Sequence, residues 1–499
     1  MFSMSTNVVG MVYTVSMDLQ RRASGNGSDE ESGPSRHVLL VNYFFPPMAG
    51  GGVPRPVKMA KYLRRLGWTV TVLTVKVPGH IDDRLSAKGD AKVLRVREWR
   101  LGWLLKMVGG SVRLMRRGWE RLTRRRSADP TLLDRGFAYE EQEIESSKIG
   151  WVVPAVRAAL WAHRRRRIDV AIVSLPPAAS GTVGWLLRRL RGVPYVVEYR
   201  DPWTVGAFWM GDADGRPRND LVTRARFGLT RRLEAALLRG SSGSIIVNGE
   251  AHIGRLAATF AEQTAGKPIV HIRNGVDLED VEQMPPSGTD STLRLLHTGF
   301  FYHFYTPHHL IAALRLVQDD HPEALVGIEL EFMGDGFPEQ LVHELERWGL
   351  GDLIRRTPAG SYSEALTAMH RADGLMAVLP PLDSDRDRLP TKVYEYLGTD
   401  RPILTVAHAD GAAAHLLDGV PDVLVVDNGD QAAIAAAFVA FVALARRRRA
   451  EGCPPENGRR GEAHHYRGRA VQMDAFLHQV LASRDVSVNA APVAVRTGR

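Results

Sequence analysis

The segment DRDRLPTKVYEYLGTDRPIL (residues 385–404) gathers charged and hydroxyl side chains at the predicted start of a helix. Pro390 suits the first turn, so Thr391 and Lys392 would present free backbone amides and an ammonium at the helix N-terminus. A lysine at this position opposes the helix dipole, which favours an anionic ligand such as a phosphate over an ordinary charged helix start. Glu395 lies one turn further on, where its carboxylate could accept hydrogen bonds from two sugar hydroxyls. Two more charged residues lie in the loop that approaches this helix: Asp387 and Arg388.

Two loops in the first half of the chain carry further candidates. In FFPPMAGGGVPRPVKMAKYL, the glycines Gly50, Gly51 and Gly52 would let the backbone approach a ligand closely, although a flexible turn has the same composition. The helix that follows would direct free amides toward this loop, which favours a phosphate, but the GxGxxG fingerprint is absent. In YRDPWT, Arg200 and Asp201 follow an apolar run, where they could face a cleft or form a structural ion pair. The sequence favours neither interpretation of this pair.

Apolar strand-like runs alternate with helical patterns through most of the chain. The runs occupy residues 37–43, 68–75, 169–174, 194–199, 244–248, 269–272, 293–299, 327–334, 374–380, 402–406 and 422–426. This alternation predicts βαβ units, with parallel sheets covered by helices on both faces. A polar stretch near residue 287 separates two such series, so we expect an α/β fold of two doubly wound, Rossmann-like domains facing each other across a cleft. Open parallel sheets bind ligands beyond the carboxyl ends of their strands, which is where the candidate loops fall.

The same patterns suggest domain boundaries. We expect a disordered leader at 1–35, an N-terminal domain at 36–287 and a C-terminal domain at 288–450. Residues 451–499 would hold a last packed helix, at about 463–481, and a disordered tail beyond Ser483.

Composition excludes several protein classes. The chain has 499 residues, of which 44% are hydrophobic and 24% charged, and this excludes collagen-like and fully disordered proteins. Its one cysteine, Cys453, cannot form an internal disulfide, so an oxidising compartment is not implied. The sequence contains no apolar run of about 18 or more residues, and its first residues do not have the order of a secretory signal. These features predict a cytoplasmic protein.

The net charge of +9 belongs to one segment. Residues 95–126 hold eleven Lys or Arg and two acids, while the rest of the chain is balanced at 54 of each sign. Apolar residues recur there at helical spacing with Trp99, Trp103 and Trp119 near the ends, which is typical of an amphipathic helix in an anionic lipid interface. A helix packed on the protein core with a solvated basic face is the alternative. We expect peripheral contact with the inner face of the cell membrane and no nucleic-acid binding, because the basicity is local.

Several of these segments together resemble the GT-B glycosyltransferases, in particular the retaining enzymes of family 4 (group 1). The opening PPMAGGGVPRPVKMAKYLRRLGWTVTVLT is similar to the family's first strand, glycine-rich loop and helix. RDPW resembles a segment that follows a middle strand, and RNGVD (273–277) the motif before the hinge. LPTKVYEYLGTDRPIL is similar to the donor-site helix, and VVDNGDQAAIAAAF (425–438) to the last strand-to-helix unit. The resemblance covers about residues 37–445.

This resemblance implies roles for individual residues. Glu395 would bind the ribose hydroxyls of a nucleoside-diphosphate sugar, with Thr391 and Lys392 near its diphosphate. Asp387 matches the first acid of the family's Glu-x7-Glu pattern, which contacts the transferred sugar. Arg200, with Asp201 beside it, stands where the family often has a sugar-contacting histidine. The remaining residues expected on the donor side are Gly51, Gly52, Arg273, Gly299 and Arg388.

The chain departs from the family pattern at three positions. Asp387 replaces a Glu, Arg200 replaces the usual His, and the loop FFYHFYTPHHL lacks the Arg/Lys pair that commonly neutralises the leaving diphosphate. Compensating charge could come from Lys392, Arg388 or Arg273.

The resemblance implies transfer of a hexose-type sugar with retention of anomeric configuration to a glycan or lipid-linked acceptor. The alternatives are a nucleotide-sugar epimerase or hydrolase of the same fold, and a non-catalytic nucleotide-sugar-binding protein. We expect no cofactor and no bound metal. The acid pairs Asp212/Asp214 and Asp383/Asp385 read as solvated loops, and His303, His308 and His309 have no accompanying carboxylate.

Overall fold

The protein is described from a computed structural model, which covers residues 35–48, 50–81, 85, 91–99, 148–205, 221–281, 292–301, 305–380, 386–452 and 459–489. The expected leader, most of the basic segment and the end of the tail lie outside these residues.

Within the described chain, the first sheet has seven strands in the order β3-β2-β1-β4-β5-β6-β7, and its paired strands run parallel. Strand order reverses beside β1, which is the usual place for a ligand crevice in a doubly wound sheet. The strands are β1 (His37–Val41), β2 (Thr69–Val75), β3 (Lys92–Val96), β4 (Val170–Leu175), β5 (Tyr195–Tyr199), β6 (Gly243–Ile246) and β7 (Ile269–His271).

Helices cover both faces of this sheet because successive strand residues alternate between them. In β1, Leu39 and Val41 face one helical layer, and Val38 and Leu40 face the other. The first layer is built mainly from α5 (Val152–Arg165), α6 (Ala178–Arg191) and part of α7 (Leu221–Gly240). The second contains α2 (Pro54–Arg65), and the short helices α8 (Ala251–Thr259) and α9 (Ala261–Thr264) follow β6.

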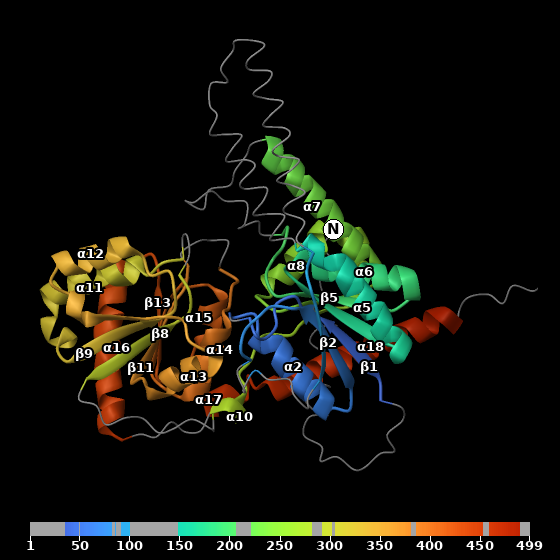
Figure 1. The fold of residues 1–499 in the computed structure, drawn as a ribbon. Coiled ribbons are helices and arrows are strands. Elements are labelled where there is room, and N and C mark those ends of the chain that lie inside the picture. Colours follow the sequence, from blue (N-terminus) through green and yellow to red (C-terminus); the bar gives the residue numbers. More distant parts are fainter. Residues whose placement is uncertain are drawn as a thin grey trace, which may run out of the picture.

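The second sheet has six parallel strands in the order β10-β9-β8-β11-β12-β13, counted over the described residues. Figure 1 shows it beside the first, so that two α/β domains stand next to each other. The strands are β8 (Leu293–Thr298), β9 (Ile328–Met333), β10 (Ile354–Thr357), β11 (Gly374–Val378), β12 (Ile403–Ala407) and β13 (Val423–Asp427). These two sheets, with their flanking helices, confirm the predicted fold class.

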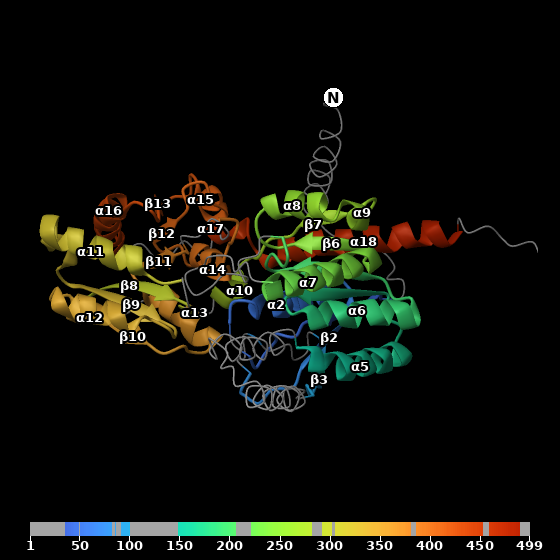
Figure 2. The same ribbon diagram turned by 90° about the horizontal axis from the view of Figure 1, so that it is seen from above.

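Two layers of helices also cover this second sheet (Figure 2). One layer contains α11 (His308–Asp320), α12 (Glu339–Arg347) and α16 (Gln431–Ala450). The other contains α10 (Leu278–Val281), α13 (Tyr362–Arg371), α14 (Thr391–Thr399) and α15 (Ala412–Leu417).

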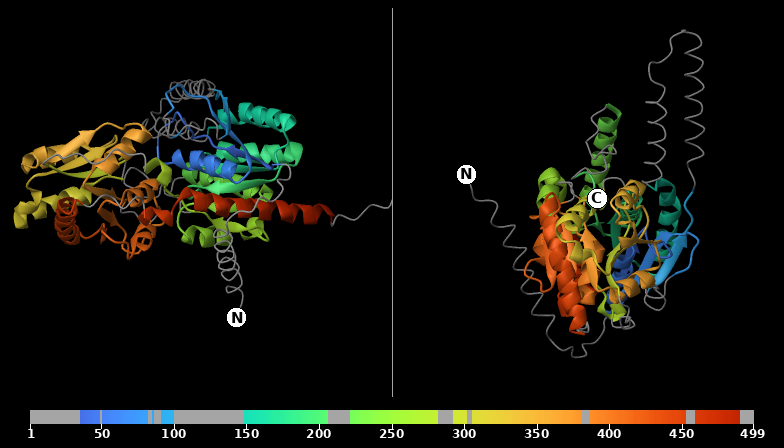
Figure 3. Two further views of the ribbon diagram at one scale, coloured as in Figure 1. Left: turned by 90° about the horizontal axis from the view of Figure 1, so that it is seen from below. Right: turned by 90° about the vertical axis from the view of Figure 1, so that its left-hand side faces the viewer.

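The end of the chain returns to the N-terminal domain. After α17 (Arg459–Glu462), the helix α18 (Tyr466–Asn489) packs on α2, burying Met473, Phe476 and Leu477 in the same core as β1. Trp68 Nε1 donates to the Asp474 carboxylate at 2.6 Å, and Figure 3 shows α18 lying along that domain. The predicted last helix is therefore present, and it extends beyond Ser483, where we expected a disordered tail.

Two edge strands differ from the sequence expectation. β3 pairs with β2 and includes Arg95 and Val96, which we assigned to the basic segment, and β10 pairs with β9. Both strands are short and carry charged side chains, so neither forms an apolar run.

The segment that joins the domains is held to α2 by buried charges. The Asp277 carboxylate accepts from Tyr62 Oη at 2.5 Å and from Lys61 Nζ at 2.7 Å, and it lies 3.0 Å from Lys58 Nζ. Lys58 Nζ also lies 2.5 Å from the Asp280 carboxylate in α10. Both carboxylates form ion pairs with Lys58 of α2, the helix that follows the glycine-rich loop. These ion pairs fix the joining segment and α10 to the N-terminal domain.

Candidate active site

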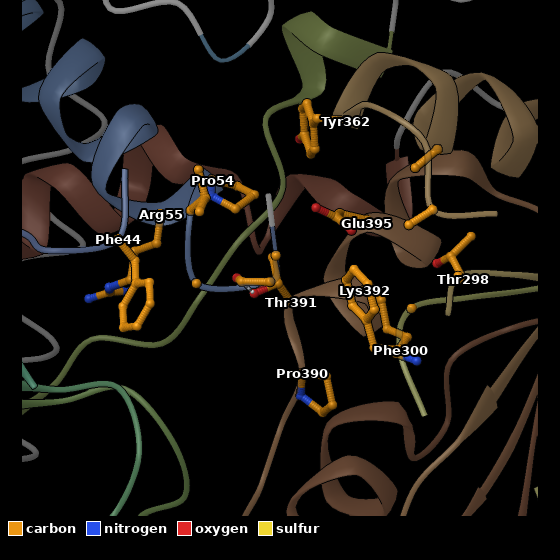
Figure 4. Close-up of a pocket in the computed structure, with 18 of the residues that line it drawn as sticks. Phe44, Pro54, Arg55, Thr298, Phe300, Tyr362, Pro390, Thr391, Lys392 and Glu395 are labelled. Atoms are coloured by element: carbon orange, nitrogen blue, oxygen red, sulfur yellow. Dashed lines mark hydrogen bonds between the residues drawn. The ribbon is translucent and has the colours of Figure 1, made fainter. Parts of the chain in front are cut away.

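A cavity of about 920 Å³ lies where the carboxyl ends of β1, β4 and β5 face those of β8 and β11. Both domains line it. In Figure 4, Phe44, Pro54 and Arg55 lie on one side, and Thr391, Lys392 and Glu395 on the other. Nine of the predicted site residues are part of this lining: Gly51, Gly52, Arg200, Asp201, Gly299, Arg388, Thr391, Lys392 and Glu395.

The glycine-rich loop forms the N-terminal wall. Gly50 has φ of +125°, a conformation that side chains rarely adopt, and this explains a glycine at that position. A Cβ added to Gly52 would lie 2.3 Å from Arg200 Nη1, so a glycine is also needed there for close approach. The Gly51 carbonyl accepts a hydrogen bond from Thr391 Oγ1 at 2.8 Å, which joins the loop to the other domain.

Arg200 lies beneath this loop with its guanidinium held by backbone carbonyls. It donates to Gly52 O at 3.1 Å and to Pro176 O at 2.7 Å, and it lies 5.3 Å from the centre of the Phe44 ring. Burial lowers the pKa of Arg200, while Asp201 opposes that shift. Arg200 and Asp201 both line the cavity, and the described contacts include no ion pair between them. Asp201 instead accepts a hydrogen bond from Asn248 Nδ2 at 3.2 Å.

The start of α14 forms the opposite wall. Thr391 is the first residue of the helix, and Pro390, which we expected in the first turn, precedes it with extended backbone. Lys392 Nζ donates to Tyr305 Oη at 2.9 Å and lies 3.1 Å from His297 Nε2. Burial lowers the pKa of Lys392 to about 7, with the neighbouring Glu395 opposing the shift.

Glu395 is 7% exposed and lies deeper in the cavity. Burial, together with the nearby Asp280 carboxylate, raises the pKa of its carboxyl to about 7 against the positive charges of Lys392 and Lys58. Tyr362, also in the lining, stands close to this carboxyl (Figure 4). A carboxyl in a cleft whose pKa is shifted this far by burial is a candidate functional group.

Two predicted residues lie away from the lining. Asp387 forms an ion pair with Arg255 of α8, and its carbonyl accepts from Gly249 N at 3.0 Å. Arg273 uses its carbonyl to accept from Arg55 Nη1 at 2.7 Å and reaches Glu250 at 3.5 Å. In the described structure, both connect elements around the cavity instead of facing into it.

Sequence reasoning missed several residues that build the walls. Arg55 is buried in the lining, where its guanidinium lies 2.9 Å from Glu198 of β5, and Ser174 donates to the same carboxylate at 3.0 Å. Asn248 donates to the Arg200 carbonyl and accepts from Leu389 N at 3.4 Å, so it links both domains. The PRP sequence after the glycines hinted at Arg55, but no local pattern indicates its partners.

The described residues contain no group of three or more His, Cys, Asp or Glu side chains arranged to hold a metal ion. The acid pairs at 212/214 and 383/385, and His303, lie outside the described ranges. No helix among those described is both long and apolar enough to cross a membrane.

Comparisons with known proteins agree with this geometry. Residues 50–275 match a family model described as a glycosyl transferase 4-like domain. Among solved structures, sucrose-phosphate synthase from Thermosynechococcus elongatus has a TM-score of 0.61 at 16% identity, covering 90% of this chain and 100% of its own. A UDP-forming α,α-trehalose-phosphate synthase from Burkholderia vietnamiensis has a TM-score of 0.55 at 14% identity, covering 90% and 100%. WaaG, a glycosyltransferase involved in lipopolysaccharide biosynthesis, has a TM-score of 0.50 at 14% identity, covering 87% and 99%. No curated protein matches the sequence.

Two Rossmann-like domains with a ligand cavity between their facing strand ends, together with these matches, define the class: the protein is a glycosyltransferase of the GT-B fold. The matched segment, residues 50–275, runs from the glycine-rich loop to the RNGVD motif. The predicted resemblance to group 1 glycosyltransferases is thereby confirmed.

Proposed function

We propose that this glycosyltransferase transfers a hexose-type sugar from a nucleoside-diphosphate sugar to a glycan or lipid-linked acceptor, with retention of anomeric configuration. The observation that carries the proposal is the convergence of Thr391, Lys392 and Glu395 on one cavity with the glycine-rich loop and Arg200. This set offers hydrogen-bond acceptors for sugar hydroxyls and positive charge for phosphates within a single cleft.

In this proposal the C-terminal wall binds the donor. The buried Glu395 carboxylate accepts hydrogen bonds from the ribose hydroxyls, while Thr391 and Lys392 lie at the diphosphate. Gly299 and Arg388 complete this wall. One similar structure is described as a UDP-forming synthase, which supports a nucleoside diphosphate as leaving group.

The N-terminal wall then faces the transferred sugar and the acceptor. Gly51 and Gly52 allow close approach, and Arg200 and Asp201 contact the sugar from the strand end of β5. Asp387 and Arg273 remain predictions at the edge of the site. In the present geometry, Asp387 would reach the sugar only after releasing Arg255.

Bond cleavage builds positive charge on the sugar and negative charge on the departing diphosphate. Cations and amide dipoles fixed at that diphosphate before the reaction stabilise the transition state more than they stabilise the bound substrate. An oxocarbenium-like state needs little from a protein nucleophile, so front-face transfer accounts for retention without a covalent intermediate.

The acceptor is proposed to be presented at a membrane surface through residues 95–126, most of which lie outside the described structure. The support is the charge excess and tryptophan spacing of that segment, together with the likeness to a glycosyltransferase of lipopolysaccharide biosynthesis. Binding to vesicles containing anionic phospholipid, measured by sedimentation, should fall when the basic residues between Arg113 and Arg126 are replaced by glutamine.

The test of activity is release of nucleoside diphosphate from a panel of UDP-, GDP- and dTDP-sugars, with and without a membrane lipid extract. The proposal is supported if one donor releases its nucleoside diphosphate only when lipid is present and the product has the anomeric configuration of that donor. Equal release without lipid indicates a hydrolase or a soluble acceptor. If one donor raises the melting temperature but none is turned over, the catalytic proposal fails and a binding role remains.

A further inference from the structure

Lys392 is held by two side chains that come from outside its own helix. Its ammonium donates to Tyr305 Oη at 2.9 Å, and it lies 3.1 Å from His297 Nε2 at the end of β8. The other ring nitrogen, His297 Nδ1, lies 3.0 Å from the Met376 carbonyl. Because a carbonyl can only accept, Nδ1 carries the ring proton, and Nε2 is left as an acceptor for the lysine.

The histidine ring itself is fixed in place. His297 is fully buried, and its ring stacks on Phe301 with centroids 4.7 Å apart and an angle of 16° between the planes. Burial and the nearby Lys392 hold the pKa of His297 well below its usual range, so the ring is neutral and keeps its acceptor.

These bonds direct the ammonium to the cavity edge beside Gly299. A Cβ at Gly299 would lie 3.0 Å from Lys392 Nζ, and both residues are part of the cavity lining. The sequence from Gly299 to Leu314 contains no Arg or Lys, so this stretch offers no permanently charged cation. The positive charge beside Gly299 is therefore that of Lys392, which belongs to α14.

We propose that His297 and Tyr305 are positioning residues that hold the Lys392 ammonium at Gly299, where it takes the place of the missing basic pair of the following loop and binds the diphosphate. This inference rests on the proposed function, because it requires a nucleoside-diphosphate ligand in the cavity. A further consequence is that ligand binding is linked to protonation of Lys392.

The linkage follows from the surroundings of the ammonium. With a pKa of about 7, Lys392 is partly neutral in the free protein at neutral pH. A bound diphosphate adds negative charge beside it and raises the pKa, so binding takes up a proton at alkaline pH. Behind the lining, His297 contacts Lys392 directly. Besides Tyr305, the other ionisable side chains that line the cavity are Arg55, His80, Arg200, Asp201, Tyr362, Arg388 and Glu395. Among these groups, the Glu395 carboxylate opposes the lowering of the Lys392 pKa and so favours the charged lysine.

The experiment uses calorimetric titration of the full chain with UDP, GDP, dTDP and the corresponding nucleosides, at about pH 6.5 and about pH 8.5 and in buffers of different ionisation enthalpy. The variants are Lys392→Met, Tyr305→Phe and His297→Gln. Tyr195→Phe is a matched control, because its hydroxyl makes a 2.5 Å bond to Leu237 O far from the cavity. Melting temperatures confirm that each variant is folded.

We expect one nucleoside diphosphate to bind the wild-type chain with net proton uptake at the higher pH. Lys392→Met should weaken that diphosphate about 10- to 100-fold, as for loss of a charge-assisted hydrogen bond, while changing nucleoside affinity little and removing the proton uptake. Tyr305→Phe removes an acceptor of the ammonium. The variant should therefore lower the pKa of Lys392 and move the alkaline loss of affinity to lower pH, while Tyr195→Phe should not. His297→Gln retains an acceptor and should lie between wild type and Tyr305→Phe.

The outcomes separate the two levels of inference. If no nucleoside diphosphate binds the wild-type chain, the proposed function itself is wrong. If one binds but Lys392→Met affects diphosphate and nucleoside equally, Lys392 is not the phosphate cation and this inference fails alone. If Lys392→Met has the expected effect but Tyr305→Phe and His297→Gln both leave the pH profile unchanged, the positioning role is refuted.

Discussion

Replacing Gly52 with alanine would place a methyl group against the guanidinium of Arg200. The added Cβ would lie 2.3 Å from Arg200 Nη1, whereas ordinary contacts begin at 3.4 Å, so the guanidinium must move by about 1 Å. Such a shift breaks the bond from Nη1 to Gly52 O, which is 3.1 Å long in the native geometry. Gly51→Ala is the matched control, because nothing lies within 4 Å of a Cβ at that residue.

The expected size follows from two opposing terms. A hydrogen bond from a charged group contributes about 1.5–3 kcal/mol, and Gly→Ala at a compatible backbone conformation returns about 0.4–1 kcal/mol through the unfolded state. Neither Gly51 nor Gly52 has positive φ, so the second term applies to both. We therefore expect Gly52→Ala to destabilise the protein by about 1–2 kcal/mol, and Gly51→Ala to be neutral or slightly stabilising.

Thermal unfolding checks this prediction, since 1 kcal/mol corresponds to roughly 2–4 °C in domains of this size. A double-mutant cycle isolates the contact: in an Arg200→Ala background the methyl group meets no guanidinium, so Gly52→Ala should cost nothing. If Gly52→Ala lowers the melting temperature equally in both backgrounds, the steric argument is wrong, and Arg200 is not positioned by this loop.

Three further predictions test the site and the charges that join the domains. Glu395→Gln should stabilise the ligand-free protein by up to about 3 kcal/mol at pH above 7 and by little near pH 4.5. The reason is that the raised pKa of Glu395 in the folded state makes its ionisation costly as the pH rises between these values. Melting curves of both proteins across this pH range test the prediction, and a difference in stability that does not change with pH would contradict it. Asp277→Asn should destabilise the protein by about 3 kcal/mol, because buried Lys58 loses one of its two carboxylate partners. Tyr62→Phe should cost about 1 kcal/mol, because only one hydrogen bond is lost. Chemical denaturation measures both free energies of unfolding, and equal effects would argue against a buried charge network. If Asp387 serves only in the partly exposed ion pair with Arg255, Asp387→Asn and Arg255→Ala should each lower kcat by less than tenfold and change stability by less than about 1 kcal/mol. Turnover assays and melting curves measure both effects. A large loss of turnover in Asp387→Asn alone would support the predicted contact of Asp387 with the sugar.

Most strands were predictable from runs of apolar side chains, whether the strand lies inside a sheet or at its apolar edge. Eleven such runs in the sequence correspond to eleven strands of the described structure, including β9, in which apolar and acidic residues alternate, and the half-buried edge strands β7 and β13. The two that were missed, β3 and β10, are the outermost strands at one edge of each sheet, where one side is open and charged residues such as Arg95 and Arg355 are tolerated. Hydropathy carries no signal for strands of this kind.

The part of the site that was predictable consists of residues close to one another in the sequence. Thr391, Lys392 and Glu395 follow one another on a single helix, so their common location follows from the helical repeat. Their partners do not, because His297 is 95 residues away from Lys392 along the chain, and Arg255 is 132 residues away from Asp387. Asp387 has the expected place in the loop, but its side chain is taken by that distant arginine.

Several contacts between the domains are made by residues that line the site or adjoin it. Thr391 bonds to the carbonyl of Gly51, and Asn248 joins the Arg200 carbonyl to the backbone of Leu389. Deeper in the cleft, the charge of Lys58 in α2 acts on the Glu395 carboxyl of α14. A ligand that binds Thr391 or Glu395 therefore acts on the same groups that set the distance between the domains. We therefore expect ligand binding in this cavity to be energetically coupled to the separation of the two domains, because both involve these hydrogen bonds and charges.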